Sequence, residues 1–178
     1  MTPGLLQAQS SLSRSDVMRL TDACRGELAG LLSRLDLRLE HVAAGRTIEG
    51  SYWGDEEAGL IGRRLIARPD TPLHSILHEA CHYACMDEAR RNGLHTDAGG
   101  GYLEECAVCY LQIKLADLLP SLGASRMMED MDRWGYTFRL GSTRAWFEND
   151  ADDALAWLQE RGLVDHRGNP TFQLRGTA

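Results

Sequence analysis

Apolar residues recur along this chain with two different periods, and the two periods separate helical from extended segments. Apolar positions spaced three and four apart predict helices over 16–35, 73–91, 102–119, 125–134 and 143–161. Alternation and short apolar runs predict strands over 35–42, 47–53, 59–68 and, near the end of the chain, 171–174. Two or three strands therefore precede the helix over 73–91, which indicates an α+β fold.

Turn and capping residues mark the ends of the two most regular helices. The pair Thr71-Pro72 precedes the first, with a capping residue followed by a proline suited to a first helical turn. The pair Asn92-Gly93 ends that helix, and Pro120 ends the second. The polar residues 1–12 are expected to form a loose leader ahead of the first helix.

The helix over 73–91 contains the pattern HExxH, as His78-Glu79-Ala80-Cys81-His82. On a helix its two histidines lie one turn apart on one face, where two ring nitrogens can bind a single metal ion. Glu79 is rotated about 100° from His78 and about 60° from His82 at the helical step per residue. Glu79 can therefore reach a water on the metal, but not the metal itself. This is the arrangement of two ligands and one base in zinc hydrolases.

A hydrolytic zinc site has three protein ligands and one open position, so a third ligand is expected on a second helix. Glu104 and Glu105 begin the next predicted helix, 22 and 23 residues after His82. At this point the sequence resembles the gluzincin branch of the zincin-type metallopeptidases, in which a ligand Glu on a second helix follows HExxH. The resemblance covers about residues 65–112.

The family's ExxA pattern is matched by Glu104-Glu105-Cys106-Ala107, which assigns Glu104 as the third ligand and leaves Glu105 as the alternative. The next position, often Asp or Asn in the family, is Val108 here. The carboxylate that usually orients a ligand histidine is therefore missing, and Glu105 or Asp97 are the candidates to replace it.

Two other interpretations of the motif stay open. Tyr83 and Cys85 follow HExxH in a way that is similar to the elongation factor P hydroxylase family, which implies an iron-dependent (Fe²⁺) hydroxylase with the same ligands. Alternatively, Cys81, Cys85, Cys106 and Cys109 lie within the two ligand segments and are candidates for a structural Cys/His metal site without catalysis.

The composition and the net charge argue against two classes of binding partner, nucleic acids and membranes. The net charge is −7 and no basic run is present, which argues against nucleic acid as a partner. No apolar run approaches the roughly 20 residues that span a bilayer, so no membrane partner is expected. Five cysteines without a visible export signal favour reduced thiols and a cytoplasmic location.

Together these features predict a zincin-like α+β fold. A small sheet from residues 35–68 packs on the HExxH helix, a second helix crosses it, and residues 121–178 form a helical cover on the core of residues 1–120 within one domain. The strand over 60–68 is expected to offer an edge to an extended substrate.

The expected activity is that of a zinc-dependent metallopeptidase acting on a peptide or protein substrate. In this hypothesis His78, His82 and Glu104 hold Zn²⁺ and Glu79 is the general base.

Overall fold

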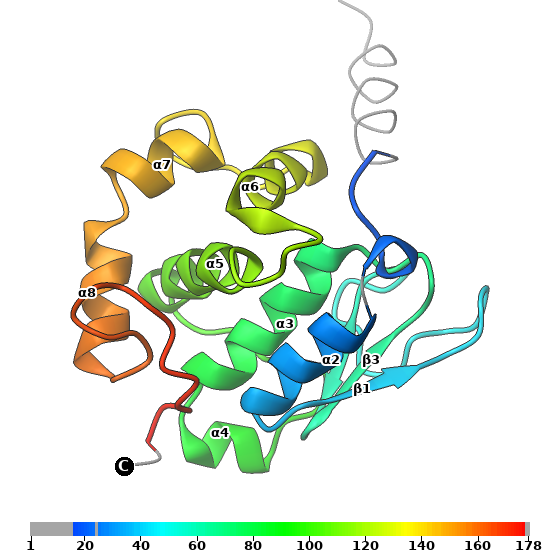
Figure 1. Ribbon diagram of the computed structural model, residues 1–178. Helices are drawn as coiled ribbons and strands as arrows, with labels where there is room; N and C mark the ends of the chain where they lie inside the picture. The colour runs from blue at the N-terminus through cyan, green and yellow to red at the C-terminus, as the bar shows by residue number, and fades with distance from the viewer. Residues whose placement is uncertain (1–15, 24, 177–178) are drawn as a thin grey trace, which may run out of the picture.

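The computed structural model describes residues 16–23 and 25–176, and the leader expected over 1–12 lies outside them (Figure 1). The fold is α+β, as the periodicity predicts. Its elements in chain order are η1 (Leu20–Asp22), α2 (Arg25–Arg34), β1 (Arg38–His41), β2 (Gly59–Ile61), β3 (Arg64–Ala67), α3 (Leu73–Cys85), α4 (Glu88–Asn92), α5 (Tyr102–Ala116), α6 (Gly123–Trp134), α7 (Thr143–Asn149) and α8 (Asp152–Glu160).

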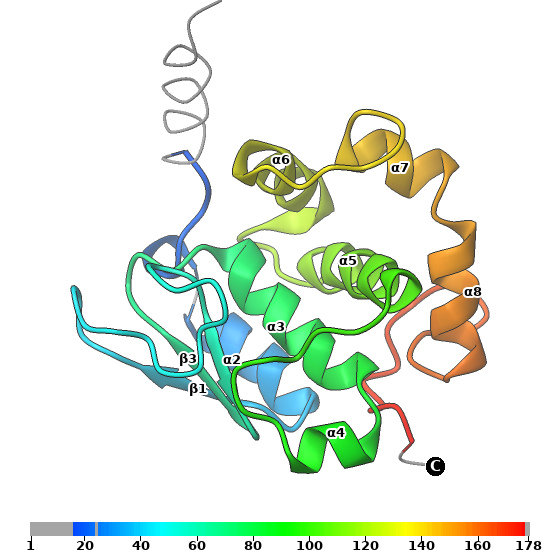
Figure 2. The same ribbon diagram turned by 180° about the vertical axis from the view of Figure 1, so that it is seen from behind.

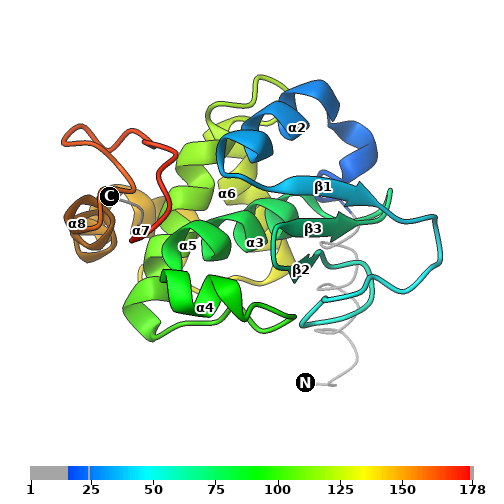
Figure 3. The ribbon, with the colours of Figure 1, turned by 90° about the horizontal axis from the view of Figure 1, so that it is seen from below.

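The sheet has the strand order β1-β3-β2, with β1 parallel and β2 antiparallel to the central strand β3 (Figure 3). The prediction of one strand over 59–68 is wrong, because the segment is a hairpin that turns at Gly62. The φ of Gly62 is 52°, in the left-handed region that glycine adopts without strain. The strand expected over 47–53 is also wrong, because these residues form turns and bends with a single bridge at Ser51.

The outer edge of β2 is bonded to another part of the chain. The amide of Gly62 donates to the carbonyl of Leu94, and the amide of Thr96 donates to the carbonyl of Leu60, both at 3.0 Å. Because β3 is central and residues 94–96 cover β2, the edge expected over 60–68 for an extended substrate is not available there.

The helix expected over 16–35 begins later than predicted, at Arg25. Residues 18–20 pair instead with residues 71–73, through an isolated bridge and two backbone hydrogen bonds of 2.9 Å. These bonds tie the start of the described chain to the segment that leads into α3, so the backbone there cannot continue a helix.

Helix α3 lies between the sheet and α5, with α2 beside it (Figures 1 and 2). Every residue of α3 except His78 is buried, including the apolar stripe formed by Leu73, Ile76, Leu77 and Ala80. The HExxH residues are therefore carried by a helix that is packed on nearly all sides, which fixes their positions.

The helix expected over 73–91 is two helices. The side chain of Asp87 accepts a hydrogen bond from the backbone amide of Arg90 at 2.9 Å and so caps the start of α4. The buried guanidinium of Arg91 donates to the carbonyl of Met86, just past the end of α3. Capping at both ends of the break therefore separates α3 from α4.

Helices α6, α7 and α8 surround the side of α5 that faces away from the sheet (Figures 1 and 3). The helix expected over 143–161 is interrupted at Asp150 and Ala151, which separates α7 from α8. No strand is described over 171–174, although Val164 and Pro170 form an isolated bridge nearby. Buried side chains of these helices belong to the same hydrophobic cluster as those of α3 and the sheet.

Within the described ranges, none of the helices combines the length and the apolar character that a bilayer crossing requires.

Candidate metal centre

The two histidines of HExxH face each other across one turn of α3. Their rings are nearly perpendicular, at 89°, and the Nε2 atoms lie 3.1 Å apart. His78 and His82 thus turn the same ring nitrogen towards a common point, as the spacing predicts.

Glu105, from the first turn of α5, completes a cluster of three ligand atoms. Its Oε2 lies 3.4 Å from Nε2 of His82 and 3.8 Å from Nε2 of His78. A tetrahedral zinc ion with bonds of about 2.0–2.2 Å places neighbouring ligand atoms about 3.3–3.6 Å apart. The three atoms therefore have the spacing of one face of such a site, and this is the one group of that kind found among the described residues.

Glu104, which the sequence assigned as third ligand, lies elsewhere. Its carboxylate is buried and accepts hydrogen bonds from Arg90 at 2.7 and 3.0 Å and from Arg175 at 3.3 Å. Adjacent residues on a helix point about 100° apart, so only one of the two glutamates can face α3. The structure places Glu105 there, whereas Glu104, the residue that the ExxA pattern favoured, does not join the group of candidate ligand atoms.

A glycine-rich loop ahead of α5 orients the Glu105 carboxylate. The backbone amide of Gly100 donates to Oε1 of Glu105 at 3.3 Å, which leaves Oε2 directed at the histidines. The carbonyl of Gly99 accepts from Arg90 at 2.7 Å. The same arginine therefore holds both Glu104 and the loop that bonds to Glu105.

The residue that orients His78 is Gln112, which the sequence analysis did not identify. Its Oε1 lies 2.9 Å from Nδ1 of His78, and its Nε2 donates to the carbonyl of His74 at 3.0 Å. Because the amide nitrogen is used on that carbonyl, the amide oxygen accepts from Nδ1–H of His78. The lone pair of His78 is then on Nε2, the atom that faces Glu105 and His82.

The position of Gln112 in the sequence contained a signal from which its contact with His78 could have been predicted. It lies seven residues after Glu105 and so on the same face of α5, and it is a fully buried amide in an apolar stretch. Buried polar side chains require partners, and the ring of His78 provides one for Gln112. Gln112 thus takes the role for which the sequence offered Glu105 or Asp97.

Burial keeps both histidines in the form that binds metals. Desolvation lowers the pKa of His78 and, together with the charges of His78 and Arg90, lowers the pKa of His82 well below its usual value. Nδ1 of His82 is buried and has no hydrogen-bond partner among the described residues. The other ring nitrogen of His82, Nε2, is directed at His78 and Glu105. It is therefore the nitrogen of this ring that is available for a strong interaction such as metal binding.

Glu79 lies at the wall of a cavity of about 280 Å³ that His78, His82 and Glu105 also line. Burial, followed by the charges of Glu57, Glu105 and Asp97, raises the pKa of Glu79 to about 8. A carboxyl group next to the ligand atoms, in a cavity open to solvent, is placed to exchange a proton with a water molecule there.

The cysteines do not join this cluster. Cys81, Cys85 and Cys109 are buried, and burial raises the pKa of each of these thiols. No cysteine belongs to the group of ligand atoms found in the described part of the chain. Cys24 lies outside the described residues.

The chain was compared with known proteins in three ways, and no family model, curated protein or solved structure matches it.

Proposed function

We propose that the protein is a metal-dependent hydrolase with a zincin-like site, and specifically a zinc metallopeptidase. His78 and His82 of α3 and Glu105 of α5 are the proposed ligands. The convergence of their Nε2, Nε2 and Oε2 atoms supports the proposal, because two imidazoles and one carboxylate are a common donor set of hydrolytic zinc sites. The hydrogen bond from His78 to Gln112 adds the outer partner that such ligands usually have.

Zn²⁺ bound by these residues would polarise a substrate carbonyl and lower the pKa of a water molecule in its open position. A divalent charge bound beside Glu79 would favour the ionised form of this carboxyl group, whose pKa burial otherwise raises, and Glu79 would then accept the proton of the attacking water and later donate it to the amine of the cleaved peptide bond. Gln112 keeps Nε2 of His78 unprotonated, and Gly100 keeps Oε2 of Glu105 directed at the histidines.

The experiment compares the wild-type protein with the variant Glu79→Gln, which keeps the size of the side chain and removes the base. Both proteins are loaded with Zn²⁺ and incubated with a mixture of peptides of defined sequence, and products are identified by mass spectrometry. We expect the variant to retain one equivalent of zinc and to cleave at least about 100-fold more slowly.

Glu56→Gln is the matched control, because Glu56 lies outside the cavity and faces Arg19 at 3.8 Å. Cleavage by Glu79→Gln at the wild-type rate, or wild-type cleavage that persists after zinc has been removed, would contradict the proposal.

An iron-dependent hydroxylase is the second candidate, and the donor set itself favours it. Two histidines and one carboxylate on one face of a metal, with open positions opposite, are also the ligands of non-haem Fe²⁺ oxygenases. Metal analysis of protein purified without oxygen separates the two candidates. Iron at one equivalent, with oxygen consumption in the presence of a reductant, would favour the hydroxylase over the peptidase.

A further inference from the structure

The outer edge of β1 is the open edge of the sheet. In the strand order β1-β3-β2, residues 94–96 cover the edge at β2, and no described residue forms a backbone hydrogen bond to the outer side of β1. Figure 3 shows β1 along one side of the sheet, with α2 next to it. The unpaired amides and carbonyls of such an edge can pair with another strand.

Two residues of β1 direct their backbone groups away from the sheet. The amide of Arg38 donates to the carbonyl of Arg63 at 2.9 Å, so the even-numbered residues of β1 face β3. Successive residues of a strand alternate, and the amides and carbonyls of Leu39 and His41 therefore point outwards. Neither residue has a backbone partner on that side within the described ranges. These groups are available to a strand that approaches from outside.

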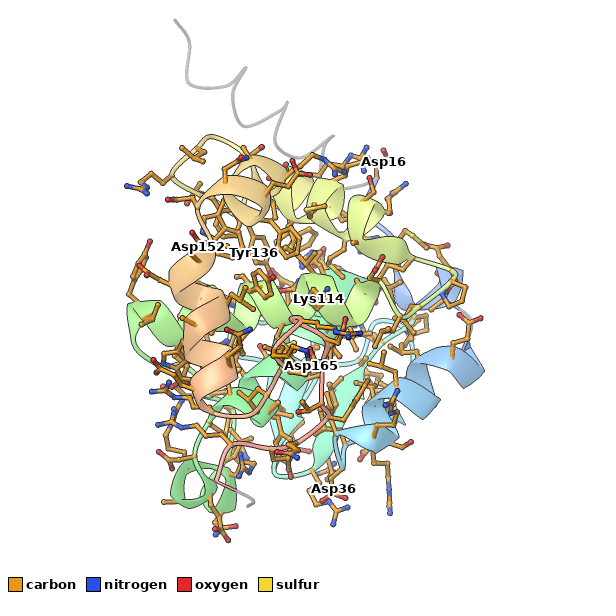
Figure 4. The ribbon with its side chains drawn as sticks, turned by 60° about the vertical axis from the view of Figure 1, so that its left-hand side comes forward. Asp16, Asp36, Lys114, Tyr136, Asp152 and Asp165 are labelled. Atoms are coloured by element: carbon orange, nitrogen blue, oxygen red, sulfur yellow. The ribbon has the colours of Figure 1, made fainter. Side chains whose placement is uncertain are left out.

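A groove of about 620 Å³ lies between this edge and α2. The residues that line it include Leu37, Leu39 and His41 from the strand side and Ala29 and Ser33 from the helix. Asp36 also lines the groove and lies at the molecular surface, where the chain turns from α2 into β1 (Figure 4). A strand that is added to β1 would therefore pass beside α2.

The solvent-facing side of α2 consists of small residues. Four exposed positions three and four apart share this side, namely Gly26, Ala29, Gly30 and Ser33. The hydroxyl of Ser33 donates to the carbonyl of Gly30 at 2.8 Å, so it is turned back onto its own helix. A Cβ at Gly26 or Gly30 would meet nothing within 4 Å, so packing within the chain does not require glycine there. Glycine weakens a helix, but it lets a second backbone approach closely.

We infer that this surface is the interface of a symmetric homodimer, in which β1 pairs antiparallel with β1 of a second copy and α2 packs beside its counterpart. A two-fold axis at Leu39 places this residue opposite itself, so that the two copies exchange their outward amide and carbonyl bonds there. The amide of His41 then reaches the carbonyl of Leu37 in the second copy. The two sheets become continuous, and the proposed metal chemistry is not involved.

The charges along β1 favour this register over the neighbouring one. With the axis at Leu39, Arg38 of each copy lies opposite Glu40 of the other, as a cross-strand pair of opposite charges. Arg38 is exposed and forms no salt bridge with any described residue. Glu40 accepts from Arg64 at 2.8 and 2.9 Å and has room for a second arginine. With the axis at Glu40, two carboxylates would face each other. The edge is therefore complementary to itself, which argues for a second copy as its partner.

The test is sedimentation equilibrium of the full chain over a series of concentrations. We expect a reversible dimer with twice the chain mass of 19.8 kDa. Arg38→Glu places like charges opposite each other and should raise the dissociation constant at least about tenfold. Ala29→Gln, at an exposed helical position, should fold normally and also weaken the dimer, because the longer side chain holds the two helices apart. Arg167→Glu makes the same charge change at an exposed residue outside the groove and should keep the wild-type constant.

Hydrogen exchange measured by nuclear magnetic resonance locates the contact. The amides of Leu39 and His41 should exchange more slowly as the concentration of the wild-type protein rises, and Arg38→Glu should reduce this protection. Circular dichroism confirms that each variant is folded. A monomer at every concentration would contradict the inference. So would a dimer that Arg38→Glu and Ala29→Gln leave unchanged, or one in which the two amides stay unprotected.

Discussion

The side-chain oxygen of Gln112 lies 2.9 Å from Nδ1 of His78, and this contact connects the two helices that carry the candidate metal ligands. It sets the tautomer of His78 and fixes the rotation of its ring. Because Glu105 and Gln112 lie on the same face of α5, one helix supplies both a candidate ligand and the hydrogen-bond partner of the candidate ligand His78 on the opposing helix.

Replacing Gln112 should therefore weaken metal binding. Gln112→Met has a similar size but no acceptor, and we expect its zinc affinity to fall roughly 10- to 100-fold. Gln112→Glu keeps an acceptor for Nδ1–H and should lose less. The affinity is measured by competition with a chromogenic chelator, with circular dichroism to confirm that each variant is folded. Equal zinc affinities for Gln112→Met and the wild type would show that the contact does not position His78.

Glu104 and Glu105 are adjacent and should give opposite results when each is changed to glutamine. Glu105→Gln should lose most of its zinc affinity with little change in the stability of the metal-free protein. Glu104→Gln should keep zinc and lose about 1.5–3 kcal/mol of unfolding free energy, because Arg90 and Arg175 then lack their buried carboxylate partner. Metal content and urea unfolding in the presence of a chelator measure the two effects separately.

The reverse pattern, zinc lost in Glu104→Gln and retained in Glu105→Gln, would restore the ligand assignment made from the ExxA pattern. It would also require α5 to rotate by about 100° from the orientation described here.

The difference between these two glutamates shows what local sequence can and cannot predict. The placement of His78, Glu79 and His82 on one helical turn depends on backbone periodicity alone, so the sequence predicts it. Which of two adjacent glutamates faces α3 depends on how α5 packs and on the arginines that arrive from α4 and from residue 175. Those contacts join residues far apart in the chain, and no periodicity encodes them.

The same reasoning applies to the sheet and the helix ends. The α+β class follows from the two periods, but the hairpin at Gly62 depends on one residue with positive φ inside an apolar run. The coverage of β2 by residues 94–96 is a tertiary contact as well, so the expected edge for a substrate could not be excluded from the sequence. The break between α3 and α4 did carry a local signal, the capping side chain of Asp87.

Gly100 and Gly101 precede α5 and should tolerate alanine very differently. A Cβ at Gly100 would lie 2.4 Å from the carboxylate carbon of Glu104, whose position Arg90 and Arg175 fix, whereas a Cβ at Gly101 meets nothing within 4 Å. We expect Gly100→Ala to lower the unfolding free energy by about 1–3 kcal/mol and Gly101→Ala to change it by a few tenths.

Gly100→Ala should also weaken zinc binding, because the Gly100 amide donates to Glu105. Thermal unfolding and zinc titration of both variants measure these effects. A Gly100→Ala protein as stable as Gly101→Ala would mean that the Glu104 carboxylate moves freely and that the arginine cluster does not hold the loop.

Removing the metal tests whether the site is catalytic or structural. The core around α3 is built from apolar side chains and contains none of the three ligand atoms, so the metal-free protein should remain folded. Zinc at 100 times its dissociation constant should add about 2.7 kcal/mol to the unfolding free energy, which appears as a higher melting temperature. Activity should be lost at chelator concentrations that leave the far-ultraviolet circular dichroism unchanged. Loss of the folded signal in step with loss of the metal would instead indicate a structural site on which the fold depends.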